Sequence, residues 1–272
     1  MKEYLRQMLQ GVESPLRARC LVREYLQARL LQVLQEKHAF ASWAFVGGTA
    51  LRFLYNLPRF SEDLDFSLVD IGVEDRFRDI LSTAKQVFAA EDYDVVIKLK
   101  DEKTVKSAFI RFSGLLFDLD LSTHASERLA IKVEIDTNPP NAAVLETTVV
   151  RRHVLLNLRH YDRASLLAGK LHAVFTRAYT KGRDIYDLVW YLSDRSWPSP
   201  NLALLNNALQ QTGSDIQSVD ENNWRSLLLE CLERLDWGQV VHDVHPFIER
   251  QEEEAFLTHD HLVSLLKRNE SF

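Results

Sequence analysis

Residues Val46 to Phe66 read VGGTALRFLYNLPRFSEDLDF, and this stretch decides the expected fold. Gly47-Gly48 closes an apolar run, and Asp63-Leu64-Asp65 follows in alternating polar and apolar order. On a β-strand, residues i and i+2 face the same way, so both carboxylates project from one face. Because Mg²⁺ takes oxygen ligands and a helix N-terminus offers N–H groups to phosphate, the stretch predicts a site for a metal-bound nucleotide.

The segment between the glycines and the acids predicts a short helix over residues 49–56. Its apolar residues would form a buried face, Arg52 would point outward, and Leu57-Pro58 would end it. Arg59 and Ser61 precede the acids, where a cation or a hydroxyl could meet a triphosphate. Taken singly, Gly-Gly is most often a plain turn and Asp-x-Asp a solvated strand face, so the combination carries the prediction.

Residues 130–136, AIKVEID, predict a further strand that carries acids. Glu134 lies between Val133 and Ile135, and Asp136 would share its face. Glu134 and Asp136 are therefore both candidates for a role at the site. The alternative is a half-exposed edge strand with ordinary acids.

Two helices with charged faces follow. Arg163, Lys170 and Arg177 recur every seven residues, which predicts a basic stripe on one helix face. Most such stripes are solvated faces with snorkelling side chains. In the next helix Asp184 could be a favourable first-turn acid, and Asp187 is expected to pair with a nearby arginine.

The ordered pattern of GGTAL…LPRFSEDLDF, a strand acid, a lysine helix and an Arg-Asp-x-x-Asp helix covers roughly residues 40 to 195. Its first part, GGTAL…LPRFSEDLDF, resembles motif I of the DNA polymerase β-like nucleotidyltransferase superfamily. More narrowly, the whole ordered pattern resembles the AbiEii/AbiGii-type nucleotidyltransferase toxins of bacteria. The resemblance implies two groups of site residues. The catalytic residues would be Asp63, Asp65, Glu134, Lys170 and Asp184, of which the first three hold Mg²⁺, or Mn²⁺ as an alternative. Glu134, between Val133 and Ile135, matches the family's hydrophobic-acid-hydrophobic pattern and is favoured as the third metal ligand, with Asp136 as its competitor. The nucleotide-binding residues would be Gly47, Gly48, Thr49, Arg59, Ser61 and Arg177.

The resemblance also implies a reaction. The protein would transfer nucleotides from an NTP to an RNA acceptor such as the 3′ end of a tRNA, releasing pyrophosphate. It would be the toxin of a toxin–antitoxin or abortive-infection system, with a cognate antitoxin as a partner. Two alternatives stay open: nucleotidylation of a small molecule or protein, and a binding protein that keeps the fold without the chemistry.

Composition agrees with a cytoplasmic enzyme. The 272-residue chain is 46% hydrophobic, and it contains neither an apolar run of membrane-span length nor an apolar signal segment near its N-terminus. Cys20 and Cys231 are expected to be buried thiols in a reducing compartment. Net charge is −6, yet residues 151–184 hold eight Lys/Arg against two acids. This basic segment, with Arg151 and Arg152 at its start, predicts contacts to RNA phosphates.

The fold class expected from these elements is α+β. Residues 1–158 would form a nucleotidyltransferase domain, a small mixed sheet with an N-terminal helix, and residues 159–272 a helical domain contributing Lys170 and Asp184 to the cleft. Helices are expected over 14–38 and 74–91, with breaks at 197–200 and 212–214. Strands are expected over 40–46, 63–68, 147–150 and 154–158, with three or four more within 93–137.

Overall fold

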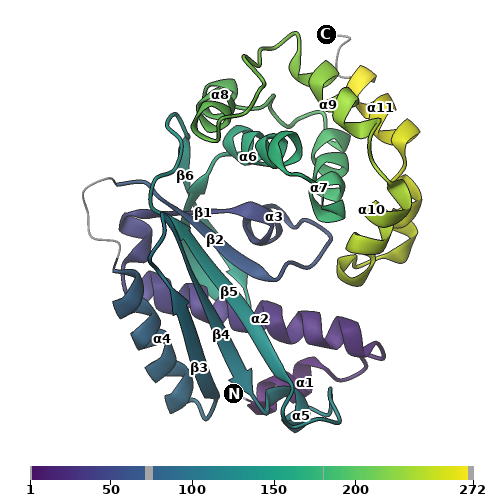
Figure 1. Cartoon of the computed structure of the whole chain (residues 1–272). Helices are drawn as coiled ribbons and strands as arrows, with labels where there is room; N and C mark the ends of the chain where they lie inside the picture. The colour runs from purple at the N-terminus through teal and green to yellow at the C-terminus, as the bar shows by residue number, and fades with distance from the viewer. Residues whose placement is uncertain (1, 71–75, 180, 269–272) are drawn as a thin grey trace. The chain divides into compact units, whose positions relative to one another are not determined.

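The computed structural model describes residues 2–70, 76–179 and 181–268. The chain forms two compact units (Figure 1). We call the first the sheet unit; it comprises Met1–Asn56, Phe60–Pro139 and Thr147–His160. The second, the helical unit, comprises Leu57–Arg59, Pro140–Glu146 and Tyr161–Phe272. The short Leu57–Arg59 segment therefore belongs to the helical unit, although the chain on either side of it belongs to the sheet unit.

The sheet has seven strands in the order β3-β4-β5-β2-β1-β7-β6. It is mixed, because β2 runs antiparallel to β1 and parallel to β5, while β1 runs parallel to β7. Every second residue of β5 is buried, as expected of a strand that packs one face on a core. The strands are β1 Trp43–Val46, β2 Asp63–Leu68, β3 Asp94–Lys100, β4 Val105–Ser113, β5 Arg128–Asp136, β6 Leu145–Arg152 and β7 Val154–Tyr161.

Helices of the sheet unit pack on this sheet, where α2 contacts both α4 and β5 (Figure 1). Helix α2 begins where the Ser14 hydroxyl accepts the N–H of Arg17 at 3.3 Å and Pro15 occupies the first turn. Helix α3 ends at Asn56, whose φ is 59°. The helices are α1 Lys2–Met8, α2 Pro15–Glu36, α3 Gly47–Tyr55, α4 Phe77–Ala90 and α5 Leu115–Asp118, with a 3-10 turn at Ala39–Ala41.

The helical unit contains six α-helices among its described residues. Side-chain caps begin several of them: Asp162 accepts the N–H of Ser165 at 2.8 Å, and Asn201 accepts that of Leu204 at 3.0 Å. The helices are α6 Arg163–Thr176, α7 Gly182–Ser193, α8 Leu202–Gln211, α9 Trp224–Leu232, α10 Trp237–Val244 and α11 His259–Arg268; 3-10 segments lie at His245–Phe247 and Gln251–Phe256.

The α+β class expected from the sequence is confirmed, and β2 has the bounds predicted for it. Other bounds differ. The strand expected over 40–46 is shortened by the 3-10 turn, and the helix expected over 74–91 begins at Phe77, with residues 74 and 75 outside the described part of the chain. Helices α1 and α5 were not predicted. Cys20 is buried as expected, but Cys231 is only half-buried. Within the described residues, no helix combines the length and apolar character of a membrane span.

Candidate active site

The two acidic strands lie next to each other in the sheet. The register of β2 and β5 pairs Asp65 with Glu134 and Asp63 with Lys132. Residues paired across parallel strands face the same side, so Asp63, Asp65 and Glu134 share one face. Asp136 pairs one step further along, with Ser67. The register thus places Glu134, rather than Asp136, directly beside an acid of β2.

The glycine turn lies against the same acids. Gly47 has a φ of +79°, and a Cβ added there would lie only 2.5 Å from Oδ2 of Asp65. Two residues on, the buried Thr49 hydroxyl donates a hydrogen bond to the backbone carbonyl of Asp63. The start of α3 is therefore fixed to both acids of β2, and only glycine leaves room for the Asp65 carboxylate.

The donor chemistry of this face fits a hard divalent cation, since its side chains are carboxylates on adjacent strands. Across residues 2–70, 76–179 and 181–268, however, no three His, Cys, Asp or Glu side chains are gathered as a ready metal cluster. Glu134 instead forms an ion pair with Lys132, 2.7 Å between Oε2 and Nζ. Asp136 has a different task, because its Oδ1 accepts the N–H of Asn138 at 2.9 Å in the following turn. Glu134 would have to exchange the Lys132 ammonium for a metal ion.

A second charged cluster lies within the helical unit, around Lys170 of α6. Its Nζ lies 3.0 Å from Oδ1 of Asp184 and 2.6 Å from Oδ2 of Asp187, both on α7. Only 14% of the Lys170 side chain is exposed, which contradicts the alternative of a solvated basic face for Lys170. Arg177, at the end of α6, pairs with the other oxygen of Asp184 and keeps 41% of its side chain exposed.

Arg59 completes this cluster from the Leu57–Arg59 segment. Its Nε and Nη2 each lie 2.6 Å from the Asp187 carboxylate, a bidentate pair in which Arg59 is 2% exposed. The expectation that Asp187 pairs with an arginine is confirmed. The Arg59 guanidinium points into the cluster, which therefore contains three cations (Arg59, Lys170 and Arg177) and two carboxylates.

Charges in the cluster stabilise one another in their ionised forms. Burial alone would lower the pKa of Lys170, but Asp187 and Asp184 outweigh it and raise that pKa. Burial would likewise raise the pKa of Asp184, and Lys170 and Arg177 instead hold it below its ordinary value. The lysine therefore remains a fixed positive charge over the physiological range.

The predicted site residues fall into two groups. Gly47, Gly48, Thr49, Ser61, Asp63, Asp65 and Glu134 lie in the sheet unit, and Arg59, Lys170, Arg177 and Asp184 lie in the helical unit. Thr49 and Gly48 are buried, and the Ser61 carbonyl accepts a hydrogen bond from Nε2 of Gln27 at 3.1 Å.

Sequence reasoning missed Glu24, a buried carboxylate on α2. Arg52 pairs with it from α3 and lies over the Phe60 ring at 4.1 Å; with only 2% exposed, Arg52 does not face outward as expected. Arg152 pairs with the same carboxylate at 3.1 Å. Its guanidinium is thereby engaged inside the sheet unit, and the contacts to RNA phosphates expected of Arg151 and Arg152 stay a prediction. The signal for Glu24 was an acid in the middle of a long helix whose other charged residues, apart from the terminal Glu36, are arginines.

The comparison with protein families decides the assignment. The family model described as "Nucleotidyl transferase AbiEii toxin, Type IV TA system" matches residues 29–259. The chain belongs to this AbiEii family. The predicted family resemblance is thereby confirmed.

Solved structures share the fold of this AbiEii-family protein. The crystal structure of JHP933 from Helicobacter pylori is 21% identical, with a TM-score of 0.53 over 92% of this chain and 93% of that one. A second H. pylori structure, described as a candidate nucleotidyltransferase, is also 21% identical, with a TM-score of 0.56 over 92% and 96%. A search of the curated proteins finds no match.

Proposed function

We propose that this AbiEii-family protein transfers a nucleotidyl group from an NTP to the 3′ hydroxyl of an RNA acceptor, such as a tRNA, and releases pyrophosphate. In this proposal it acts in the bacterial cytoplasm as a toxin that a cognate antitoxin counteracts. The observation that carries the proposal is the placement of Asp65, which pairs with Glu134 in the sheet and lies against Gly47 at the start of α3. Family membership over residues 29–259 supports it.

Of the three carboxylates, two are fixed by contacts with α3 and the third forms an ion pair that a metal ion would have to replace. Asp63 and Asp65 are held to α3 through Thr49 and the close approach of Gly47, whereas Glu134 pairs with Lys132. They would hold Mg²⁺ or Mn²⁺, which when bound offsets charge on the triphosphate and the attacking hydroxyl. Gly47 and Gly48 open α3, and its first N–H groups are suited to phosphate oxygens.

The helical unit would supply positive charge. Lys170 and Arg177 can offset charge that develops on the transferring phosphoryl group, and a preorganised cation does so without reorganisation cost. Asp184 orients both of them, since it pairs with each. Arg59 acts one step away, because it holds Asp187, which in turn holds Lys170.

An RNA acceptor is favoured by the charge distribution. The segment 151–184 carries a local +6 within a chain of net charge −6. Part of this charge is used internally, as Arg152 and Lys170 show, but Arg151 is exposed and Arg177 is partly exposed. A flexible single-stranded 3′ end can reach carboxylate-held metals without duplex opening, which favours a tRNA-like end over duplex DNA.

The test is transfer of label from each α-³²P-labelled NTP, with and without total RNA, followed by separation of RNA from protein. We expect label in RNA, and none when EDTA is present. Asp63→Ala and Asp65→Ala should lose several orders of magnitude in turnover, because metal charge stabilisation contributes several kcal/mol. Asp94→Ala, an exposed acid on β3, is the matched control and should behave as the wild type.

Undiminished turnover in EDTA, or in either variant, would refute the metal-dependent mechanism. Label that moves to protein or a small molecule instead of RNA would refute the proposed acceptor while retaining the chemistry.

A further inference from the structure

One side of the sheet stays partly exposed on the strands next to the carboxylates. In β4 and β5 buried residues alternate with partly exposed ones, and the buried set packs towards α4, as Phe112 does on Phe88 with ring centroids 5.1 Å apart. The opposite side consists of the even-numbered residues of β3 and β5 and the odd-numbered residues of β4. We call this side the open face; Figure 1 shows its three strands side by side. Asp63, Asp65 and Glu134 lie on the same side, because β2 pairs with β5.

The register arranges the open face in rows that lead to the carboxylates. Two rows cross four strands each, from Lys98 through Phe109 and Lys132 to Asp63, and from Lys100 through Ser107 and Glu134 to Asp65. Each row spans three strand spacings, which is about 14 Å between its first and last Cα atoms. An RNA strand whose 3′ end lies at the carboxylates can therefore lay its preceding nucleotides over β5, β4 and β3.

Three cations on the open face are available for phosphate groups. Lys98 and Lys100 are exposed on β3, and Arg111 is half-buried on β4. Within the parts of the chain that the structure describes, none of the three forms an ion pair. Lys132 is not counted with them, because Glu134 holds it at 2.7 Å. Each of the three can therefore meet a phosphate group without first giving up a carboxylate partner.

Protection of a sheet edge explains only part of this pattern. Strand β3 is an edge strand, and lysines there discourage pairing with a second chain. Arg111 lies one strand further in, where β3 and β5 already cover both edges of β4. At the far end of the open face Asp94 and Arg128 share a row and offset each other, so the excess of cations lies in the rows that reach or adjoin the carboxylates.

We propose that the open face binds the single-stranded 3′ segment of the RNA acceptor, through phosphate contacts of Lys98, Lys100 and Arg111. The inference rests on the proposed transfer to RNA and names the surface that holds the acceptor. Cations spread over a flat face suit an extended single strand, because its successive phosphates can follow them whatever its sequence. We assign no base to Phe109, because Arg111 and Lys132 already lie 5.8 and 6.0 Å from the centroid of its ring.

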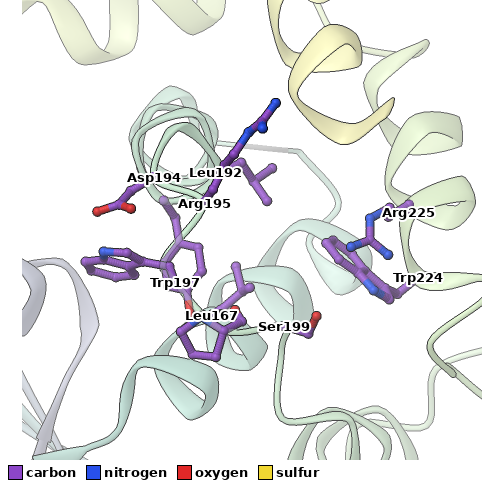
Figure 2. A pocket seen from close by; sticks show the side chains of 10 residues that line it. Leu167, Leu192, Asp194, Arg195, Trp197, Ser199, Trp224 and Arg225 are labelled. Carbon is purple, nitrogen blue, oxygen red and sulfur yellow. Dashed lines mark hydrogen bonds between the residues drawn. The ribbon is translucent and has the colours of Figure 1, made fainter. Parts of the chain in front are cut away.

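A cavity of about 180 Å³ in the helical unit is less suited to the strand. Trp197 and Trp224 are among the residues that line it (Figure 2). Arg163 lies 4.9 Å over the ring of Trp197, and Arg225 lies 4.3 Å over the ring of Trp224. Each indole therefore already has a guanidinium on its face, and the cavity offers no open ring on which a base could stack.

The test is binding of a short, fluorescein-labelled single-stranded RNA to the full-length protein, measured by fluorescence anisotropy across a salt series. EDTA is present and NTP is absent, so the result does not depend on transfer. We expect the face variant, which combines Lys98→Gln, Lys100→Gln and Arg111→Gln, to bind at least about tenfold more weakly than the wild type. The slope of log Kd against log salt should also fall by about 2, because each phosphate contact on a single strand contributes about 0.7.

A control variant separates the open face from overall charge. It combines Lys37→Gln, Arg76→Gln and Lys85→Gln, which remove the same charge from the ends of α2 and α4 and from α4 itself, and it should bind as the wild type does. Unchanged RNA binding in the face variant would overturn the proposal and would favour an acidic protein partner for this face. Equal losses in the two variants would overturn it as well. RNA binding that depends on the open face, in a protein that transfers label to another acceptor, would refute the proposed reaction and not this surface.

Discussion

At Gly47 two constraints fall on one residue, a left-handed backbone and a carboxylate 2.5 Å from where a Cβ would lie. We expect Gly47→Ala to reduce transfer at least about a hundredfold, because the methyl group must displace Asp65 and the backbone must carry strain of about 1–2 kcal/mol. Gly169→Ala is the matched control: Gly169 lies in α6 with open space around it, so alanine there should leave turnover unchanged and stabilise the helix by about 0.5–1 kcal/mol. Transfer kinetics and thermal unfolding of both variants check this, and normal turnover in Gly47→Ala would contradict the assigned role of the glycine turn.

Lys170 is the other residue at which one substitution is decisive. Lys170→Ala should lower turnover strongly and destabilise the fold by about 3 kcal/mol, near the low end for a broken buried pair, because Arg59 and Arg177 still neutralise the two aspartates. Lys170→Arg should restore stability better than turnover, since a planar guanidinium differs from an ammonium in shape and hydration. Denaturant unfolding and kcat measure the two effects, with the exposed Lys267→Ala as control. If Lys170→Arg restores stability and kcat to the same extent, Lys170 has a structural role and no specific role in transfer.

At the scale of elements, the pairing of β2 with β5 distinguishes two acids that the sequence left as competitors. Glu134→Gln should abolish transfer, because it removes a carboxylate beside Asp65. Asp136→Asn should cost little activity, since an amide oxygen can still accept the Asn138 N–H. Metal titrations of turnover in both variants provide the measurement. If Asp136→Asn is the inactive variant instead, Asp136 and not Glu134 is the third acid of the site.

Glu24 connects α2 to α3 electrostatically and makes stability depend on pH. Burial would raise its pKa, but His153, Arg52 and Arg152 lower it from 4.5 to about 2. A depressed pKa stabilises the folded state above pH 4.5, and this contribution, about 3 kcal/mol, is lost as pH falls towards 2. Glu24→Gln should therefore be less stable than the wild type at pH 7 and approach it near pH 2. Urea unfolding between pH 7 and pH 2 measures this difference in stability. Glu102→Gln, at an exposed position, is the control and should follow the wild type at every pH.

These elements also show how far sequence reasoning reaches. The period-2 alternation of residues 63–66 predicted β2 because it depends only on neighbours along the chain. Arg52 was placed wrongly because its partner, Glu24, lies 28 residues upstream on another helix. The seven-residue spacing found the helix face of Lys170, but not its burial, which α7 imposes. The Asp65–Glu134 pairing was likewise out of reach, since register is a tertiary property.

For the whole molecule, family membership leads to a test in cells. Induced expression of the full chain should slow bacterial growth, because the AbiEii family is that of a toxin. The Asp63→Ala variant, expressed to the same level, should not slow growth. A neighbouring antitoxin gene, supplied in trans, should restore growth even where the two proteins do not co-purify. Growth arrest by the Asp63→Ala variant would show that toxicity does not depend on the proposed chemistry.

The Leu57–Arg59 segment has a consequence for how such genes can recombine. Arg59 neutralises Asp187, 128 residues downstream, and the Pro58 carbonyl accepts the N–H of Glu249 at 3.1 Å. A crossover near codon 160 between two divergent relatives would combine residues 161 onwards of the helical unit from one relative with the Leu57–Arg59 segment of the other. Any mismatch there would remove the bidentate arginine from the buried Asp187 and leave that carboxylate with its Lys170 pair. We therefore expect that recombination cannot replace the helical unit alone, and that functional genes keep the segment for residues 57–59 together with the segment from residue 161 onwards.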